Sequence, residues 1–244
     1  MTRVLGIDIG GTGMKAAEVD ISTGEMVSER QRIATPKPAT PEAMAEVVAE
    51  LTGQCSWKGP VGMGFPGVVQ SGVIRTAANL DKSWVGVDAD KIFTDVAGCD
   101  VVMINDADAA GLAEARFGAA KGVKGVVILL TLGTGIGSAI FVDGKLVPNT
   151  EFGHLDLNGK LAEHRASARV KEDKDLSYAK WSKQLSKVLR EMEKLFWPEL
   201  FVLGGGISAS FDKFEDHLKK VRTPVVAAEM ENKAGIVGAA LAHA

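Results

Sequence analysis

The chain has 244 residues, which suffices for one large domain or for two lobes that each bury a core. Hydrophobic residues make up 46 % and charged residues 24 %, as in ordinary globular proteins, so a disordered or fibrous chain is excluded. The formal net charge of -3 argues against a protein that binds nucleic acid through overall positive charge, so we expect no nucleic-acid partner.

The sequence shows neither a membrane segment nor a signal peptide. No apolar stretch is long enough to cross a bilayer, and the first residues lead directly into a strand pattern. We therefore expect no membrane partner and a cytoplasmic location. Cys55 and Cys99 lack the spacing of a disulfide framework or a cysteine zinc site, so both are expected to be free thiols.

The first motif is a glycine-rich turn between two predicted strands, residues 3–9 and 14–20. No helix follows the turn, so it is not the strand-to-helix loop of Rossmann or P-loop proteins. Its backbone N–H groups can still bind phosphate oxygens, with a hydroxyl and an ammonium as added donors. The candidate phosphate-binding residues are Gly10, Gly11, Thr12 and Lys15. Asp8 could hold Mg²⁺ through water, and a simple tight turn is the alternative.

The next part of the chain alternates predicted strands with one helix. Residues 25–33 predict a strand, and Thr40 is expected to cap a helix that begins at Pro41. Two further strands are expected at 61–65 and 68–74.

Two loop residues in this part are candidates for sugar binding. The turn at Gly67 leaves main-chain amides free to touch a small ligand. Asn79 could bond a sugar hydroxyl, because an amide both donates and accepts, although an ordinary turn asparagine is the more common explanation.

A carboxylate stands where a strand ends and a helix begins. Residues 101–104 predict a buried strand, and the alanine-rich segment after Asp106 predicts a helix. Ligands of α/β proteins bind at the carboxyl ends of the strands, so Asp106 is placed to meet a substrate. The alternative is that Asp106 or Asp108 only caps the helix.

A second strand, glycine turn and strand follow at 125–131, 132–137 and 138–142. The turn residues with phosphate-binding potential are Gly133, Thr134, Gly135 and Gly137. A repeated device of this kind is more specific than a single glycine motif, because two such hairpins could hold an anionic donor from both sides.

The remaining chain supplies polar loops and a basic segment. Glu151, His154 and Glu163 have the spacing of a site built from loops, although a lone histidine is more often structural. A helix is expected within 173–196, and positive charge gathers in and before it, as on a solvated face or on a surface for a polyanion. These basic residues are Arg165, Arg169, Lys171, Lys174, Lys180, Lys183, Lys187 and Arg190.

The C-terminal part predicts a strand at 198–203, a third glycine turn at 204–206 and a helix at 214–221. A closing helix is expected at 232–242.

Six motifs, in this order along nearly the whole chain, resemble those of the ROK family of sugar kinases. They are Asp8-Ile9-Gly10-Gly11-Thr12, Gly64-Phe65-Pro66-Gly67, Asn105-Asp106, Leu132-Gly133-Thr134-Gly135-Ile136-Gly137, Glu151-Phe152-Gly153-His154 and Leu203-Gly204-Gly205-Gly206. Within the family, the segments 79–84 and 162–167 and the compact length are most similar to actinobacterial members that use polyphosphate.

The resemblance implies an α/β protein with the actin-like ATPase (ribonuclease H-like) fold, two α/β lobes with a cleft between them. We expect a smaller N-terminal lobe at 1–107, with the C-terminal helix 232–244 packing back on it, and a larger lobe at 108–231. Dimers are common in families of this shape, so a homodimer is expected.

The resemblance also implies roles for single residues. Asp106 matches the catalytic base, the glycine hairpins match the phosphate loops, and a third turn lies on the adenosine side. The implied glucose-binding residues are Gly67, Asn79, Asn105, Asp106, Glu151, His154 and Glu163, and the turn residues are Gly204, Gly205 and Gly206. Many relatives bind zinc through a cysteine cluster after the histidine; residues 155–162 hold no cysteine, so no structural zinc is expected.

The sequence therefore predicts a glucokinase that moves a phosphoryl group from polyphosphate, and also from ATP, to the 6-hydroxyl of glucose, with mannose as a possible second acceptor. A strictly ATP-dependent hexokinase is the first alternative. A sugar-sensing repressor is disfavoured because no helix-turn-helix precedes the first strand, and an actin-like ATPase without a sugar acceptor is the last alternative.

Overall fold

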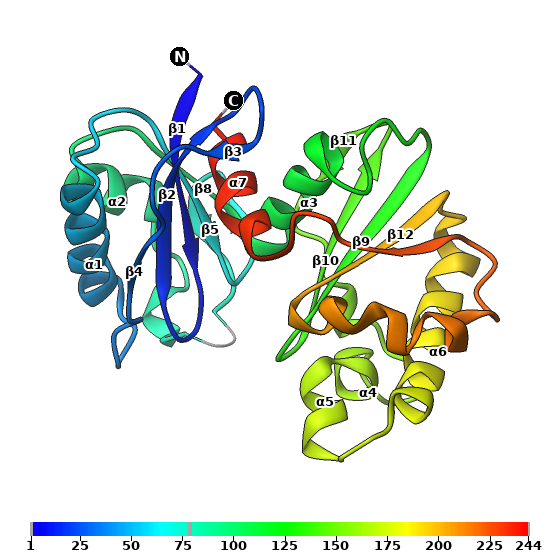
Figure 1. The fold of residues 1–244 in the computed structure, drawn as a ribbon. Helices are drawn as coiled ribbons and strands as arrows, with labels where there is room; N and C mark the ends of the chain where they lie inside the picture. Colours follow the sequence, from blue (N-terminus) through cyan, green and yellow to red (C-terminus); the bar gives the residue numbers. More distant parts are fainter. Residues whose placement is uncertain (1, 78–79, 244) are drawn as a thin grey trace. The chain divides into compact units, whose positions relative to one another are not determined.

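The computed structural model describes residues 2–77 and 80–243. Contacts divide the chain into two compact units, Met1–Ala113 with Lys233–Ala244, and Glu114–Asn232, which we call unit 1 and unit 2. Each is a sheet covered by helices (Figure 1). The predicted lobe limits at 107/108 and 231/232 stay a prediction. Among the described residues, no helix is long and apolar enough to cross a membrane.

Unit 1 contains a mixed six-stranded sheet. Its path is β3-β2-β1-β5-β8, with β4 paired to β2 beside β3. The strands are β1 (Arg3–Ile9), β2 (Met14–Asp20), β3 (Glu25–Met26), β4 (Gln31–Ile33), β5 (Val61–Phe65) and β8 (Val101–Asn105). β1 and β2 form an antiparallel hairpin, whereas β1, β5 and β8 run parallel. The carboxyl ends of three parallel strands therefore meet at one edge of the sheet.

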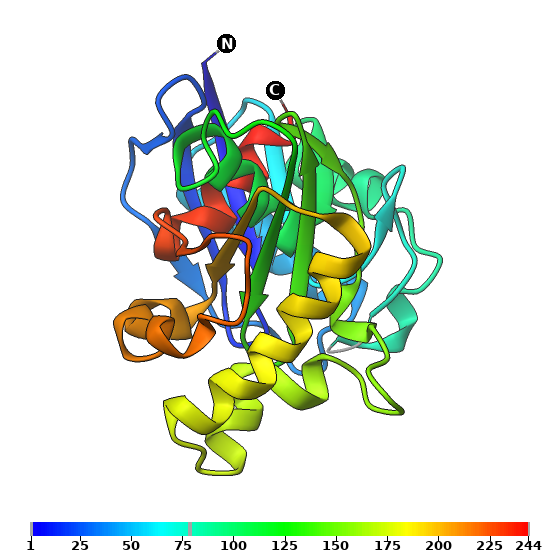
Figure 2. The same ribbon diagram turned by 90° about the vertical axis from the view of Figure 1, so that its right-hand side faces the viewer.

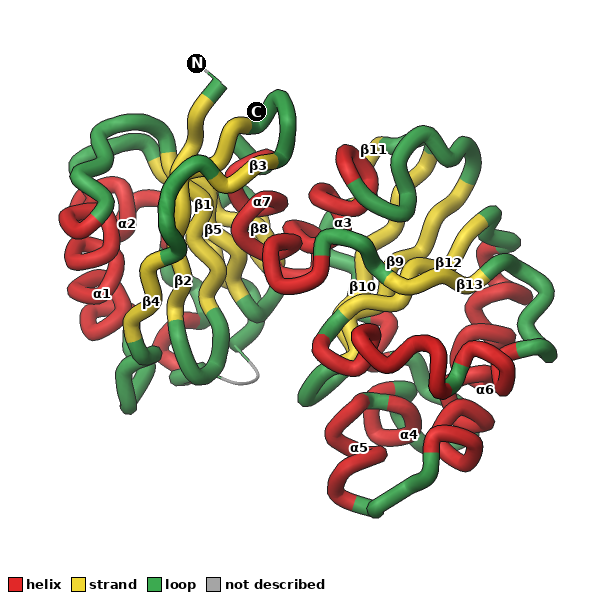
Figure 3. The backbone as a smooth tube through the Cα atoms, in the orientation of Figure 1, coloured by secondary structure: helices red, strands yellow, loops and turns green. Residues whose placement is uncertain are grey.

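Helices cover both faces of this sheet (Figure 3). α1 (Pro41–Gln54) and α2 (Ala89–Ala97) pack one face through a buried apolar cluster that includes Trp84. Thr40 caps α1 as predicted, accepting the Ala43 N–H at 3.3 Å. The loops of this unit add the small hairpin of β6 (Val69–Gln70) and β7 (Val73–Ile74), and the short 3-10 helix η1 (Lys82–Trp84).

On the other face, the closing helix α7 (Ala234–Leu241) packs closely against β1 and β5. Glycines allow this approach, because a Cβ on Gly6 would lie 2.0 Å from the Ile236 carbonyl oxygen, and one on Gly62 would lie 1.8 Å from that of Ala239. A Cβ on Gly238 would lie 1.6 Å from the Ala109 oxygen of α3 (Asp106–Phe117). The position of α7 thus depends on three residues that lack a side chain.

Unit 2 contains a five-stranded sheet in the order β11-β10-β9-β12-β13. The strands are β9 (Val126–Leu132), β10 (Ile136–Val142), β11 (Lys145–Val147), β12 (Leu200–Gly204) and β13 (Val225–Ala227). β9 and β10 form an antiparallel hairpin, and β9, β12 and β13 run parallel. Both units therefore use the same order of a hairpin followed by two parallel strands.

The long helix α6 (Tyr178–Phe196) covers one face of this sheet (Figure 2). Its buried residues recur at helical spacing, from Trp181 and Leu185 to Val188 and Met192, and pack against β9 and β12. The other helical segments of the unit are η2 (Phe152–His154), α4 (Glu163–Ala166), α5 (Ala168–Asp173), η3 (Gly206–Lys213), η4 (Glu215–Leu218) and η5 (Glu231–Lys233).

Three predicted elements need correction. The strand expected at 25–33 is two short strands, because the segment between β3 and β4 has no ladder partner. The strand expected at 68–74 turns back on itself at Ser71 and Gly72, both at positive φ, to form the β6–β7 hairpin. The helix expected at 214–221 is the short 3-10 segment η4, following the 3-10 segment η3.

Candidate functional site

The candidate residues of unit 1 lie at the carboxyl edge of its parallel strands. Asp8 pairs in register with Gly64 of β5, and Phe65 pairs with Asn105 of β8. Asp106 follows directly as the first residue of α3. Asp8, Asn105 and Asp106 are thus brought to one edge, as expected, whereas Asn79 lies outside the described residues.

Asn105 caps α3 and ties it to the neighbouring turn. Its side-chain oxygen accepts the N–H groups of Ala107 at 2.9 Å and Asp108 at 3.0 Å. Its amide nitrogen donates to the carbonyl of Gly67 at 3.0 Å. This buried asparagine satisfies the first backbone donors of the helix and holds the Gly67 turn beside it.

Asp106 is half-buried, and its Oδ1 accepts the Ala107 N–H at 2.8 Å. Because Asn105 serves both Ala107 and Asp108, the start of α3 does not depend on the Asp106 carboxylate alone. A Cβ on Gly64 would lie 3.7 Å from the Asp106 Cα, and Gly64 itself adds no side chain beside Asp106. This arrangement places a carboxylate at the strand end.

The first glycine hairpin is the predicted turn between antiparallel strands. Gly10 donates to the carbonyl of Gly13 at 3.1 Å, and the Arg32 guanidinium donates to the Thr12 carbonyl at 3.2 Å. Gly11 and Thr12 are exposed, so their backbone groups are accessible to a phosphate.

Asp8 and Lys15 face each other across this hairpin. The Lys15 Nζ lies 3.2 Å from Asp8 Oδ2, in a pair that stays partly exposed. A single partly exposed carboxylate fits Mg²⁺, which binds through one or two carboxylates, its own waters and substrate phosphates. Among the described residues, no group of three or more His, Cys, Asp or Glu could hold a metal ion by itself.

The second glycine hairpin joins β9 to β10 in unit 2. Gly133 donates to the Gly135 carbonyl at 3.1 Å, and its own carbonyl accepts the Arg169 N–H at 3.1 Å, which attaches the start of α5 to the turn. Gly137 continues into β10 opposite Thr131. The exposed Gly133 and Thr134 thus form the tip of the hairpin.

The three polar residues predicted from loops of unit 2 come together beside this hairpin. His154 Nδ1 lies 4.0 Å from Glu151 Oε2, and its Nε2 lies 4.0 Å from Glu163 Oε1. A Cβ on Gly135 would lie 2.5 Å from Glu163 Oε2, so the carboxylate lies directly against the turn. Two carboxylates flanking one imidazole can hold several hydroxyls of a sugar.

Burial and nearby charges shift the pKa of the Glu151 carboxyl. Partial burial raises the pKa of its carboxyl, and the Glu163 carboxylate raises that pKa further, against the lowering effect of His154. Ser138 positions the segment by accepting the Phe152 N–H at 2.9 Å and donating to the Thr150 carbonyl at 2.7 Å. A hydrogen-bonding ligand would stabilise the charged form of Glu151.

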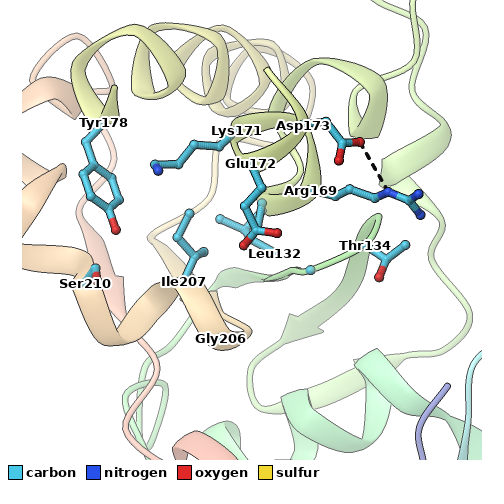
Figure 4. A pocket seen from close by; sticks show the side chains of 12 residues that line it. Leu132, Thr134, Arg169, Lys171, Glu172, Asp173, Tyr178, Gly206, Ile207 and Ser210 are labelled. Carbon is cyan, nitrogen blue, oxygen red and sulfur yellow. Dashed lines mark hydrogen bonds and ion pairs between the residues drawn. The ribbon is translucent and has the colours of Figure 1, made fainter. Parts of the chain in front are cut away.

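A pocket of about 590 Å³ lies between the second hairpin, α5, the start of α6 and the third glycine turn (Figure 4). Its walls include Gly133 and Thr134, and Gly206 with Ile207. The hairpin and the third turn meet because β9 and β12 are parallel neighbours, with Gly204 opposite Thr131. Gly205 has a φ of +85°, and a Cβ there would lie 2.4 Å from the Leu132 oxygen.

Several side chains of this pocket were not predicted as site residues. Tyr178 lies on one side, with the Lys171 Nζ 4.3 Å from its ring centre, and Arg169 pairs with Asp173 on the other (Figure 4). Ser210 of η3 also lines it. The basic run containing Arg169 and Lys171 was the only sequence signal for this wall.

Known proteins resemble this chain in sequence and in fold. The model of the ROK family matches residues 4–170. The polyphosphate glucokinase of Mycobacterium tuberculosis (strain CDC 1551 / Oshkosh) is 54 % identical over 238 residues, 97 % of this chain and 89 % of the relative. That of Mycobacterium leprae (strain TN) is 50 % identical over 241 residues, 98 % and 74 % of the two chains.

Two solved structures give the same result. The inorganic polyphosphate/ATP-glucomannokinase of Arthrobacter sp. strain KM matches with a TM-score of 0.93 at 51 % identity, covering 99 % of this chain and 98 % of the other. A glucokinase of Streptomyces griseus, solved with glucose and AMPPNP, matches with a TM-score of 0.83 at 26 % identity, covering 98 % of both. The fold is the actin-like ATPase fold expected from the sequence. From the matched family model and these relatives, the chain belongs to the ROK family.

Proposed function

We propose that the protein transfers a phosphoryl group from inorganic polyphosphate, and also from ATP, to the 6-hydroxyl of glucose. The observation that carries this proposal is the carboxylate of Asp106 at the end of β8, beside a helix start that Asn105 caps. The relatives named as polyphosphate glucokinases, at 50 % and 54 % identity over nearly the whole chain, support the choice of substrates.

In this proposal Asp106 is the general base. Its carboxylate accepts the proton of the sugar hydroxyl as the hydroxyl attacks the terminal phosphorus of the donor. The bond from that phosphorus to the bridging oxygen breaks, and the shortened polyphosphate or ADP leaves with the electron pair.

The sugar is held by directed hydrogen bonds to its other hydroxyls. Glu151, His154 and Glu163 supply two acceptors and an imidazole within one group. Asn105 and the Gly67 turn would contribute beside Asp106, and Asn79 is assigned to the same role by the sequence. Positioning of this kind accounts for much of the catalysis of phosphoryl transfer.

The glycine hairpins are the proposed phosphate sites. Backbone N–H groups of the exposed residues Gly11, Thr12 and Thr134 can spread the charge of the transferring group. The pocket beside Gly206 has a volume of about 590 Å³, within the range of small-molecule sites, and its Tyr178 and Ile207 side chains suit the nucleoside of ATP. Polyphosphate, which lacks a nucleoside, would contact the Gly133–Thr134 wall of this pocket and leave the part beside Tyr178 and Ile207 empty.

Mg²⁺ is part of the proposal, with Asp8 as its protein partner through water. When bound, the ion neutralises donor phosphate charge. Lys15 orients the Asp8 carboxylate and contributes a second positive charge. We also propose mannose as a second acceptor, a homodimer and a cytoplasmic location. The Arthrobacter structure, which is named as a glucomannokinase, supports mannose as an acceptor.

The test is a donor and acceptor matrix with the purified protein. Formation of glucose 6-phosphate from glucose, or of mannose 6-phosphate from mannose, is measured with polyphosphate or ATP as donor in the presence of Mg²⁺. We expect turnover of glucose with both donors. Turnover with ATP only would favour the strictly ATP-dependent alternative, and donor consumption without any sugar would remove the kinase assignment.

A further inference from the structure

A second cavity of unit 2 is lined mainly by cationic and apolar side chains. It has a volume of about 330 Å³, and three separate segments of the unit build it. Its lining residues are Lys160, Arg165, Val170, Lys174, Leu176 and Gln184. Three cations gather around one small space, and no acidic residue is part of this lining.

The cations are held there by contacts that leave their charge uncompensated. The Arg165 guanidinium donates to the carbonyl groups of Leu157 and Lys160, which are neutral acceptors. These bonds fix the turn that carries Lys160. Within the described part of the chain, no ion pair involves Lys160, Arg165 or Lys174.

The cations also repel one another. The nearby Lys174 ammonium is the main cause that lowers the pKa of Lys160, and Arg165 adds to the effect. Like charges held this close in a folded protein cost free energy unless an anion binds to them. The turn that carries Lys160, the end of α5 and one face of α6 thus form a cavity that suits an anion.

We propose that this cavity, which we call the distal pocket, binds a remote segment of the polyphosphate chain during catalysis. The inference rests on the proposed function and extends it by naming a second contact for the donor. The distal pocket and the pocket beside Gly206 lie against different faces of α5, because Val170 and Lys174 line one and Arg169 and Lys171 line the other. Only a long chain could contact both across a helix of roughly 10 Å diameter.

Substrate length is therefore the property that separates this pocket from the catalytic centre. The proposal requires that tripolyphosphate and ATP, when bound at the second glycine hairpin, do not extend to this pocket, so their use should not depend on it. Long-chain polyphosphate should gain affinity from two or three additional cation–phosphate contacts.

The experiment compares two double variants of equal charge. Lys160→Gln with Lys174→Gln removes two cations of the distal pocket and keeps Arg165, which holds the turn. Lys183→Gln with Lys187→Gln removes two exposed cations from α6 that do not line the pocket, and it is the matched control. Kinetics are measured for each with long-chain polyphosphate, tripolyphosphate and ATP at several salt concentrations.

We expect the pocket variant to raise the KM for long-chain polyphosphate by roughly tenfold and to reduce its salt dependence by about one to two in logarithmic slope. Its kinetics with ATP and tripolyphosphate should match the wild type, which also shows that it is folded. The control variant should change the KM for long-chain polyphosphate by less than about threefold.

Equal increases of the KM for long-chain polyphosphate in both variants would indicate a diffuse basic surface and would overturn the proposal. An unchanged KM in the pocket variant would overturn it as well. In both cases the proposed function stands, because the wild type still uses polyphosphate. A wild type that used ATP alone would overturn the proposed donor and this inference together.

Discussion

At the scale of single residues, the assignment depends on how the side chains of Asn105 and Asp106 divide their roles. Both asparagine and aspartate are good helix caps, so the sequence alone cannot say which of them closes the helix. The structure gives two backbone N–H groups to Asn105, which also bonds the Gly67 turn. The position of a possible catalytic base was predictable, and the two helix-capping hydrogen bonds of Asn105 beside it were not.

Replacing the Asp106 carboxylate by an amide tests its role as base. Asp106→Asn keeps an oxygen for the Ala107 N–H and removes the proton acceptor. We expect kcat to fall by roughly 10²-fold or more while glucose affinity changes little. Steady-state kinetics and glucose titration by calorimetry measure the two effects. A kcat within a few fold of the wild type would exclude Asp106 as the base.

Glu151 should reduce stability at neutral pH. Burial raises the pKa of its carboxyl above the ordinary value of 4.5 in the folded state. A carboxyl whose pKa is higher in the folded state than in the unfolded state favours folding only while it is protonated. This contribution to stability is complete below pH 4.5 and is lost as the pH rises through the pKa of the folded state. Glu151→Gln should therefore have a higher Tm than the wild type at pH 7, with the difference vanishing towards pH 4.5.

The same variant should bind glucose more weakly, because the amide is a poorer acceptor for sugar hydroxyls. Thermal unfolding across pH and glucose titration check the two parts. Glu29→Gln, an exposed position of unit 1 at which no catalytic role is assigned, is the control. A Tm for Glu151→Gln below that of the wild type at pH 7 would mean that the carboxylate is structural.

At the scale of elements, the two glycine hairpins and the long parallel strands followed the sequence closely, whereas the strands expected at 25–33 and 68–74 did not. The two glycine turns, flanked by β1 and β2 and by β9 and β10, are where the pattern predicted them. The short 3-10 segments η3 and η4 were not predictable as such, because η3 packs against β9, β12 and β13 and η4 packs against α6, and local periodicity does not show these contacts. Elements with a strong period were therefore found, and those determined by tertiary contacts were not.

The contact between the second hairpin and the sugar group gives a test at this scale. A Cβ on Gly135 would lie 2.5 Å from Glu163 Oε2, so Gly135→Ala must displace that carboxylate. We expect the KM for glucose to rise by about tenfold or more. Gly133→Ala is the comparison, since no atom lies within 4 Å of a Cβ there.

Gly133→Ala should leave the KM for glucose near that of the wild type, because its methyl group does not touch Glu163. Kinetics with glucose and donor varied separately distinguish the two variants. An equal increase of the glucose KM in both would show that the hairpin backbone, and not the Glu163 position, determines sugar binding.

The packing of α7 gives a second test. Gly238→Ala would place a Cβ 1.6 Å from the Ala109 carbonyl oxygen, so α7 must shift from α3. We expect a loss of about 1–3 kcal/mol or more in the free energy of unfolding, measured by urea denaturation. Gly53→Ala in α1 has no atom within 4 Å of its Cβ and should be neutral or stabilising. Equal stability of Gly238→Ala and the wild type would contradict this packing.

At the scale of the whole molecule, the two units repeat one topology, a hairpin followed by two parallel strands. The two glycine hairpins of the sequence indicated this repeat. The pocket beside Gly206 was not predictable from local pattern, because Gly133, Tyr178 and Ile207 are far apart in the chain and meet only through the order of β9 and β12. The grouping of Glu151, His154 and Glu163 was expected from the sequence, whereas the position of the Glu163 carboxylate against Gly135 of the second hairpin was not.

Charge distribution predicts how the donors respond to salt. The chain has a net charge of -3, yet its basic residues concentrate between Lys160 and Arg190. A long polyanion bound there releases counterions, so the KM for polyphosphate should rise steeply between 50 and about 200 mM salt. The KM for ATP should rise much less, since fewer phosphates are bound. Parallel salt dependence of both donors would contradict a local polyanion surface.

The measurement that tests the central claim most directly is phosphorus NMR of the wild type and Asp106→Asn with long-chain polyphosphate, Mg²⁺ and glucose. The account predicts that the wild type converts terminal phosphate groups into glucose 6-phosphate, only when glucose is present, and that Asp106→Asn does so at least about 10²-fold more slowly. Glucose 6-phosphate formed at equal rates by both proteins, or by neither, would contradict it.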